Sequence, residues 1–131
     1  MTWQVAETPL AAGPSAGIFS IAFRDAEHGI IVGGDYRKEQ EAVDNLAVTS
    51  DGGVTWTLVK GLSGFRSVVR YVPGTKTLVA LGPSGGDYST DDGQTWKPIG
   101  GPGFDTLSFA PRKSIGWGAG AEGRIGRLAL E

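Results

Sequence analysis

The chain has 131 residues, the size of one ordinary domain, and a formal net charge of −2. This near balance excludes the basic field that recruits nucleic acid or an anionic membrane surface, and the apolar runs are too short for membrane insertion. With no cysteine and one histidine, the sequence offers neither disulfides nor a usual zinc ligand set. The first ten residues lack the basic and apolar regions of a signal peptide, and the compartment stays undecided.

Glycine is the most informative component of the composition. The 22 glycines among 131 residues are more than twice the average usage of roughly 7%. Gly and Asp-Gly clusters separate short apolar runs, a pattern typical of strands joined by tight turns. No segment carries the apolar stripe of an amphipathic helix. The sequence therefore predicts an all-β fold.

The expected strands fall into three units in chain order. The first unit, residues 18–60, has strands expected at 18–24, 29–33, 46–50 and 55–60. The second unit, residues 65–99, has them at 65–72, 77–82, 87–90 and 95–99. The third unit, residues 104–130, has only three, at 104–110, 116–120 and 124–130. A repeat of this length is typical of propellers, solenoids and arrays.

A strand expected at residues 2–6 completes the pattern. Its sequence TWQV matches TWTL at 55–58 and TWKP at 95–98, where the fourth strands of the first two units begin. The third unit lacks a fourth strand of its own. We therefore expect three four-stranded sheets, one of them split between the two ends of the chain.

One motif, S/T-x-D-x-G-x-T-W, occurs twice, 40 residues apart. Its positions are filled by Thr49, Asp51, Gly53, Thr55 and Trp56, and again by Ser89, Asp91, Gly93, Thr95 and Trp96. A short acidic side chain bonds the backbone two residues on, glycine supplies positive φ, and threonine and tryptophan favour the strand that follows. We expect both motifs to stabilise the fold, with the indole packed between sheets, rather than to catalyse or bind.

This motif is the Asp-box, or BNR, motif, and the chain resembles the sialidase-type β-propellers that carry it. The segments 25–33 and 116–120 further resemble the photosystem II stability/assembly-factor-like branch. The resemblance covers nearly the whole chain but only the C-terminal half of a typical member. It implies a propeller module of three four-stranded blades, with each motif on the hairpin between the third and fourth strands at the outer rim. It also implies a non-enzymatic binding or assembly scaffold, in a family whose members are often extracytoplasmic.

The alternative is a fragment of a larger sialidase-like or "oxidoreductase"-labelled propeller enzyme whose catalytic residues lie outside this chain. Sialidases carry an arginine triad and a tyrosine–glutamate pair. Arg24, Arg66 and Arg70 are scattered arginine candidates, but no such pair can be assigned. The acids of the two motifs, Asp92 and Asp87 are the available carboxylates for glycoside hydrolysis or calcium. We expect the motif acids to be committed to turns instead.

Two further signals are weak. Residues 118–123 match G-x-G-x-x-G, but no helix follows, so we expect a turn rather than a dinucleotide site. His28 is expected in a solvated turn between two strands. The sequence therefore predicts no cofactor, no metal and no catalytic residue, which favours a protein that is not an enzyme.

An insertion at residues 35–45 is the candidate partner-binding loop. It joins the second and third strands of the first unit, and in propellers such loops share a face with the connections between blades that usually binds partners. Its residues Asp35, Tyr36, Arg37 and Lys38 combine charge with an aromatic ring. A solvated excursion without a ligand is the alternative. The partner, a protein or a small ligand, is not specified by the sequence.

Three blades are too few for the four to eight of usual propellers. An open arc leaves two apolar faces and an unpaired strand edge exposed. Pairing of residues 2–6 of one chain with 124–130 of another gives a homodimer with six blades, and a trimer with nine is the next possibility. Alternatively, the 131 residues belong to a longer single-chain propeller.

Overall fold

The computed structural model describes residues 1–130 and contains strands with one short 3₁₀ turn, η1 (Ala121–Gly123). The first sheet consists of β1 (Ala16–Phe23), β2 (Gly29–Asp35), β3 (Leu46–Thr49) and β4 (Thr57–Leu58). The second consists of β5 (Val68–Tyr71), β6 (Leu78–Gly82), β7 (Gly85–Ser89) and β8 (Lys97–Ile99). The third consists of β9 (Thr106–Phe109), β10 (Ile115–Ala119) and β11 (Ile125–Ala129).

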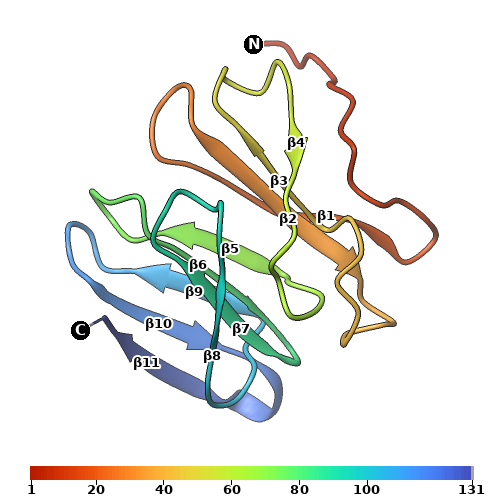
Figure 1. The fold of residues 1–131 in the computed structure, drawn as a ribbon. Helices are drawn as coiled ribbons and strands as arrows, with labels where there is room; N and C mark the ends of the chain where they lie inside the picture. Colours follow the sequence, from red (N-terminus) through yellow and green to blue (C-terminus); the bar gives the residue numbers. More distant parts are fainter. Residues whose placement is uncertain (131) are drawn as a thin grey trace.

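The three sheets follow one another through space in chain order (Figure 1). Within each sheet, neighbouring strands are antiparallel and consecutive in sequence. The first strands lie side by side, β1 next to β5 and β5 next to β9, so they form the inner edge of the arc. This is the arrangement of successive propeller blades. The expected fold class, an all-β propeller module, is confirmed.

Apolar side chains fill the space between the first two sheets because both sheets turn one face towards each other. The buried cluster takes Ile30, Val32 and Leu46 from the first sheet, Val69, Leu78 and Ala80 from the second, and Leu62 from the link between them. Its members alternate along the strands, as the two-residue period of a strand requires. A second cluster, centred on Val79, Leu81 and Leu107, joins the second sheet to the third.

In the first two sheets, a glycine near the end of the second strand lets that strand lie close to the chain that enters the sheet. A Cβ added at Gly33 would lie 1.9 Å from the carbonyl oxygen of Gly17, and one at Gly82 would lie 2.3 Å from that of Phe65. No larger residue fits either place without moving the backbone. Glycine is therefore required for the same structural reason at both positions, in the first and in the second unit.

Both ends of the arc present unpartnered sheet faces. On the first sheet, Ile21 and Phe23 are exposed, and Leu10 covers part of the same face. On the third sheet, Trp117 and Ile125 are exposed. Residues 1–9 form no strand in the single chain. Within residues 1–130 there is no helix long and apolar enough to cross a membrane.

Candidate binding surface

The two repeated motifs form hairpins, residues 49–56 between β3 and β4 and residues 89–96 between β7 and β8, and we call them the motif hairpins. In the first, Asp51 accepts hydrogen bonds from the Thr55 hydroxyl (2.6 Å), the Thr55 amide (2.9 Å) and the Thr49 hydroxyl (2.8 Å). The Thr49 hydroxyl oxygen also accepts the Gly53 amide at 3.0 Å.

The second motif hairpin repeats these bonds. Asp91 accepts from the Thr95 hydroxyl (2.6 Å), the Thr95 amide (2.8 Å) and the Ser89 hydroxyl (2.8 Å). These bonds, the threonine hydroxyl first, lower the pKa of Asp51 and of Asp91 to about 2. Both acids are therefore ionised and already bonded within their own hairpins. Their role as fold-stabilising residues remains a prediction.

The motif tryptophans lie on the side of their sheet that faces the preceding unit. Trp96 packs against the cluster between the first and second sheets, and its Nε1 donates to the Gly93 carbonyl at 2.9 Å. Trp56 packs against the cluster of Leu10, Ile31 and Ala47 on the open face of the first sheet. The rings of Trp56 and Phe23 are arranged edge to face, with centroids 6.1 Å apart.

The three arginines considered for an anion-binding triad are directed to separate partners. Arg24 binds Asp92 of the second motif hairpin through Nε and Nη2, the latter at 2.8 Å. Arg66 binds Asp87 at 2.9 Å, and Arg70 donates to Ser20 and to a main-chain carbonyl. These three side chains do not form a common site.

Asp92 ties three parts of the fold together. Besides Arg24, it accepts a 2.6 Å bond from the Tyr71 hydroxyl. Burial alone would raise the pKa of Asp92, but the bonds from Arg24 and Tyr71 lower it overall. Burial and the bond to Asp92 raise the pKa of Tyr71. This cluster links the end of β1 in the first sheet to β5 and a motif hairpin of the second, and its charges are satisfied internally.

His28 lies in the turn between β1 and β2, where its Nδ1 is 3.0 Å from the Asp25 carboxylate. Amides of residues 27 and 28 also donate to Asp25, and these main-chain bonds, His28 first, lower its pKa to about 2. Residues 118–123 form the end of β10 and the turn η1 before β11. Within residues 1–130, no group of three or more His, Asp or Glu side chains is placed to hold a metal ion.

The loop at 35–45 presents its tip to solvent. Asp35 accepts the Ser15 hydroxyl at 2.7 Å and the Arg37 amide at 2.9 Å, and these two bonds lower the pKa of Asp35. Tyr36 is about half exposed, and the Arg37 guanidinium lies 6.0 Å from the centre of its ring. Lys38 closes the tip with a main-chain bond to the Asp35 carbonyl. The tip therefore offers cationic donors beside an exposed aromatic ring.

The rest of the loop, from Glu39 to Asn45, is bonded to the segments that flank the strands of the second unit. The Glu39 carbonyl accepts the Phe65 amide and the Ser84 hydroxyl, both at 3.0 Å. Asn45, which is buried, donates to main-chain carbonyls of residues 33 and 64. Phe19 meets Phe65 edge to face at 4.8 Å and Tyr36 at 6.2 Å. These contacts tie the loop to both the first and the second unit.

A buried ion pair, which the sequence did not reveal as such, lies under this face. Arg66 and Asp87 are each 1% exposed and 2.9 Å apart. The guanidinium also donates to the hydroxyls of Ser63 and Ser84 and to the Phe65 carbonyl. The sequence signal was weak, because Arg66 shares its expected strand, 65–72, with Arg70, and Asp87 stands in β7 beside tyrosine and serine.

The comparisons with known proteins agree with this geometry. No family model matches the chain, and no curated protein matches it. Among solved structures, it matches YCF48 bound to D1 peptide, with 26% identity and a TM-score of 0.69. In fold, the chain is similar to YCF48. YCF48 from Cyanidioschyzon merolae also matches, with 20% identity and a TM-score of 0.65, and supports the fold alone.

The likeness to YCF48 extends over almost all of this chain but a minor part of the other. The two matches cover 95% and 90% of this chain, and 39% and 35% of the YCF48 chains. The chain thus spans little more than a third of the YCF48 structures it matches. The resemblance expected from the repeated motifs is confirmed, and the fold is that of a YCF48-like propeller.

Proposed function

We propose that the chain is a non-enzymatic scaffold that binds an extended segment of a partner protein on the face formed by the loop at 35–45. The observation that carries this proposal is the similarity to YCF48, which has been solved with a bound D1 peptide. The resemblance of the sequence to assembly-factor-like propellers points the same way. The scaffold holds its partner without chemistry of its own.

The exposed tip is suited to such a segment. Arg37 and Lys38 supply donors for the carbonyl or carboxylate oxygens of a peptide, and Tyr36 supplies a flat apolar surface for one of its side chains. Because the Glu39 carbonyl bonds the loop to Phe65 and Ser84 of the second unit, little further ordering is needed on binding. The loop is therefore a preorganised contact surface.

Binding of fluorescently labelled D1 peptide, followed by anisotropy, tests the proposal. We expect saturable binding that Tyr36→Ala and Arg37→Ala each weaken at least tenfold. Val43→Ala changes an exposed residue of the same loop and serves as the matched control, with unchanged affinity. No binding to the unaltered chain, or equal affinity in all three variants, would refute the assignment of this face.

We also propose that two chains close one six-bladed ring. The two open apolar faces, that of the first sheet and that of the third, support this proposal because each end of the arc lacks a neighbour. Three chains with nine blades are the next arrangement. The ring places two copies of the loop at 35–45 on one face, related by a two-fold axis.

A further inference from the structure

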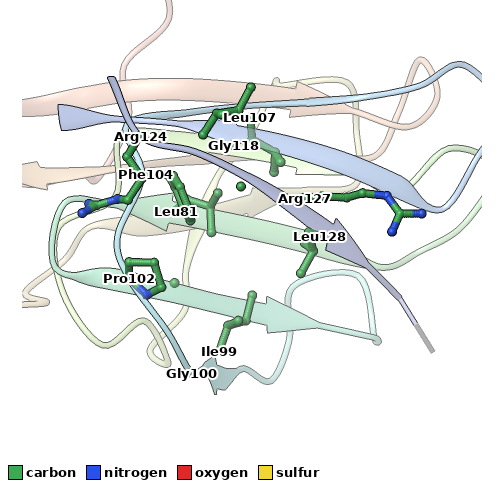
Figure 2. A pocket seen from close by; sticks show the side chains of 13 residues that line it. Leu81, Ile99, Gly100, Pro102, Phe104, Leu107, Gly118, Arg124, Arg127 and Leu128 are labelled. Atoms are coloured by element: carbon green, nitrogen blue, oxygen red, sulfur yellow. The ribbon is translucent and has the colours of Figure 1, made fainter. Parts of the chain in front are cut away.

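The outer edge of β11 is unpaired in the described chain. Its counterparts, β3 and β7, are each covered by a fourth strand, β4 and β8. Beside the free edge, a groove of about 320 Å³ runs between the second and third sheets. Its apolar walls include Ile99, Phe104 and Leu128 (Figure 2). A second hollow of about 400 Å³ adjoins Ile99 and Leu128 along the same edge.

The equivalent space between the first and second sheets is filled by Trp96. Gly61 stands five residues after Trp56, and a Cβ added there would lie 2.8 Å from Cδ1 of Trp96. Gly101 stands five residues after Trp96, yet nothing lies within 4 Å of its added Cβ. The interface between the second and third sheets thus has a glycine, Gly101, at the position of Gly61, but no indole ring packs against it.

Trp3 is the indole available for this place. It follows Thr2, as Trp56 and Trp96 follow their threonines, and it is 97% exposed. Val5, on the same side of an extended chain, is 96% exposed. Two large apolar side chains therefore stand in water near the start of the chain.

Leu10 fixes the direction in which this segment leaves the fold. It packs on Ile31 and Ala47 of the first sheet, much as Leu62, in the link between sheets, packs at the interface of the first and second. Residues 10–15 thus occupy the position of a link between two sheets. The strand-like segment before them belongs beside a sheet that precedes the first one.

We propose that residues 2–6 of a second copy add to the free edge of β11 and place Trp3 and Val5 in this groove. This rests on the two-chain ring proposed above. The same chain cannot supply the strand, because four residues from Leu10 back to residue 6 span at most about 14 Å. The groove lies beyond the second sheet, roughly two sheet spacings or 20 Å from the face where Leu10 is held. Figure 1 places the two ends on opposite sides of the arc.

The existing fourth strands define the pairing. Thr57 and Lys97, which directly follow the motif tryptophans, pair with Val48 of β3 and Tyr88 of β7. Val48 pairs in turn with Ile30, three residues before Gly33 in the second strand of the first sheet. Tyr88 pairs with Val79, three residues before Gly82 in the second strand of the second sheet.

In the third sheet, the position three before Gly120 is Trp117, which pairs with Arg127. The proposed register therefore sets Gln4 opposite Arg127 and Val5 opposite Gly126, one of the residues that line the groove.

A disulfide tests this register, since the chain has no cysteine of its own. Opposed residues of antiparallel strands have Cα atoms about 4.5–5.5 Å apart, within the range that a disulfide spans. We expect Gln4→Cys/Arg127→Cys to give, on mild oxidation, a covalent dimer that reduction dissolves. The control is Gln4→Cys/Ser108→Cys. Ser108 lies on β9 and pairs with Trp117 from the side opposite Arg127, two strands away from the proposed edge. No covalent dimer is expected from this variant.

Three results would overturn the proposal. These are a disulfide closed within one chain, no disulfide in the Gln4→Cys/Arg127→Cys variant, or equal cross-linking in the control. If the unaltered chain has twice the single-chain mass while the disulfide fails to form, the two-chain ring stands and this strand placement fails. As a second measurement, Trp3→Ala should raise the dimer dissociation constant at least tenfold, and an unchanged constant would contradict the groove.

Discussion

Removing the charge of Asp87 should destabilise the fold severely, because its partner Arg66 has no access to water. The Asp87 carboxylate accepts the Arg66 Nε at 2.9 Å and the amide and hydroxyl of Ser63 at 3.0 and 2.8 Å. In Asp87→Asn, the side chain keeps its shape but loses the charge that compensates the buried guanidinium. Breaking a buried ion pair in this way costs about 3–5 kcal/mol.

Urea unfolding followed by tryptophan fluorescence measures this cost. With a slope of roughly 1–3 kcal/mol per M for a protein of this size, the midpoint should fall by about 1 M or more. Asp105→Asn removes the same charge from an exposed position and should change the free energy of unfolding by no more than about 0.5 kcal/mol.

A double-mutant cycle separates the pair from its surroundings. Arg66→Met combined with Asp87→Asn should cost less than the sum of the single changes, because no unpaired charge then remains buried. A cost below about 1 kcal/mol for Asp87→Asn, or additivity in the cycle, would refute the argument that this pair is coupled and shielded from water.

Two further predictions concern the motif hairpins. Trp96→Ala should lower the free energy of unfolding in urea melts by about 3 kcal/mol. This is the lower end of the range for large buried aromatic residues, because the indole is partly exposed. Val54→Ala, at an exposed position of the other hairpin, is the control and should leave the free energy of unfolding unchanged. An unchanged midpoint for Trp96→Ala would reject the structural role. The lowered pKa of Asp51 and of Asp91, about 2, predicts stability that is complete above about pH 4 and lost as the pH falls through 2. As the pH is lowered from 5 to 2, the melting temperature of the unaltered chain should therefore approach that of Asp91→Asn. A difference between the two melting temperatures that stays constant over this range would contradict the assignment.

Local patterns made the fold predictable from the sequence. The spacing of glycines and the repeated T-W pairs placed eleven strands in three units, because turns and strand periodicity depend on neighbouring residues. The fourth strands are shorter than expected: β4 covers Thr57–Leu58 within the expected 55–60, because Thr55 bonds back to Asp51 in the hairpin. The strand expected at 2–6 is not formed within the single chain.

Contacts between distant segments were not predictable in the same way. Arg24 and Asp92 are 68 residues apart and Arg66 and Asp87 are 21 apart, so their pairing depends on how the sheets and strands come together. The anchoring of the loop at 35–45 uses the Glu39 carbonyl, a main-chain group that every residue possesses. The sequence could nominate the exposed residues of the loop but could not reveal that its middle is bonded to the second unit.

The mass of the unaltered chain in solution, measured by multi-angle light scattering over a range of concentrations, tests the central claim that two three-sheet arcs close one ring. The account predicts a single species of twice 13.6 kDa. A folded species that stays at 13.6 kDa at every concentration would contradict it.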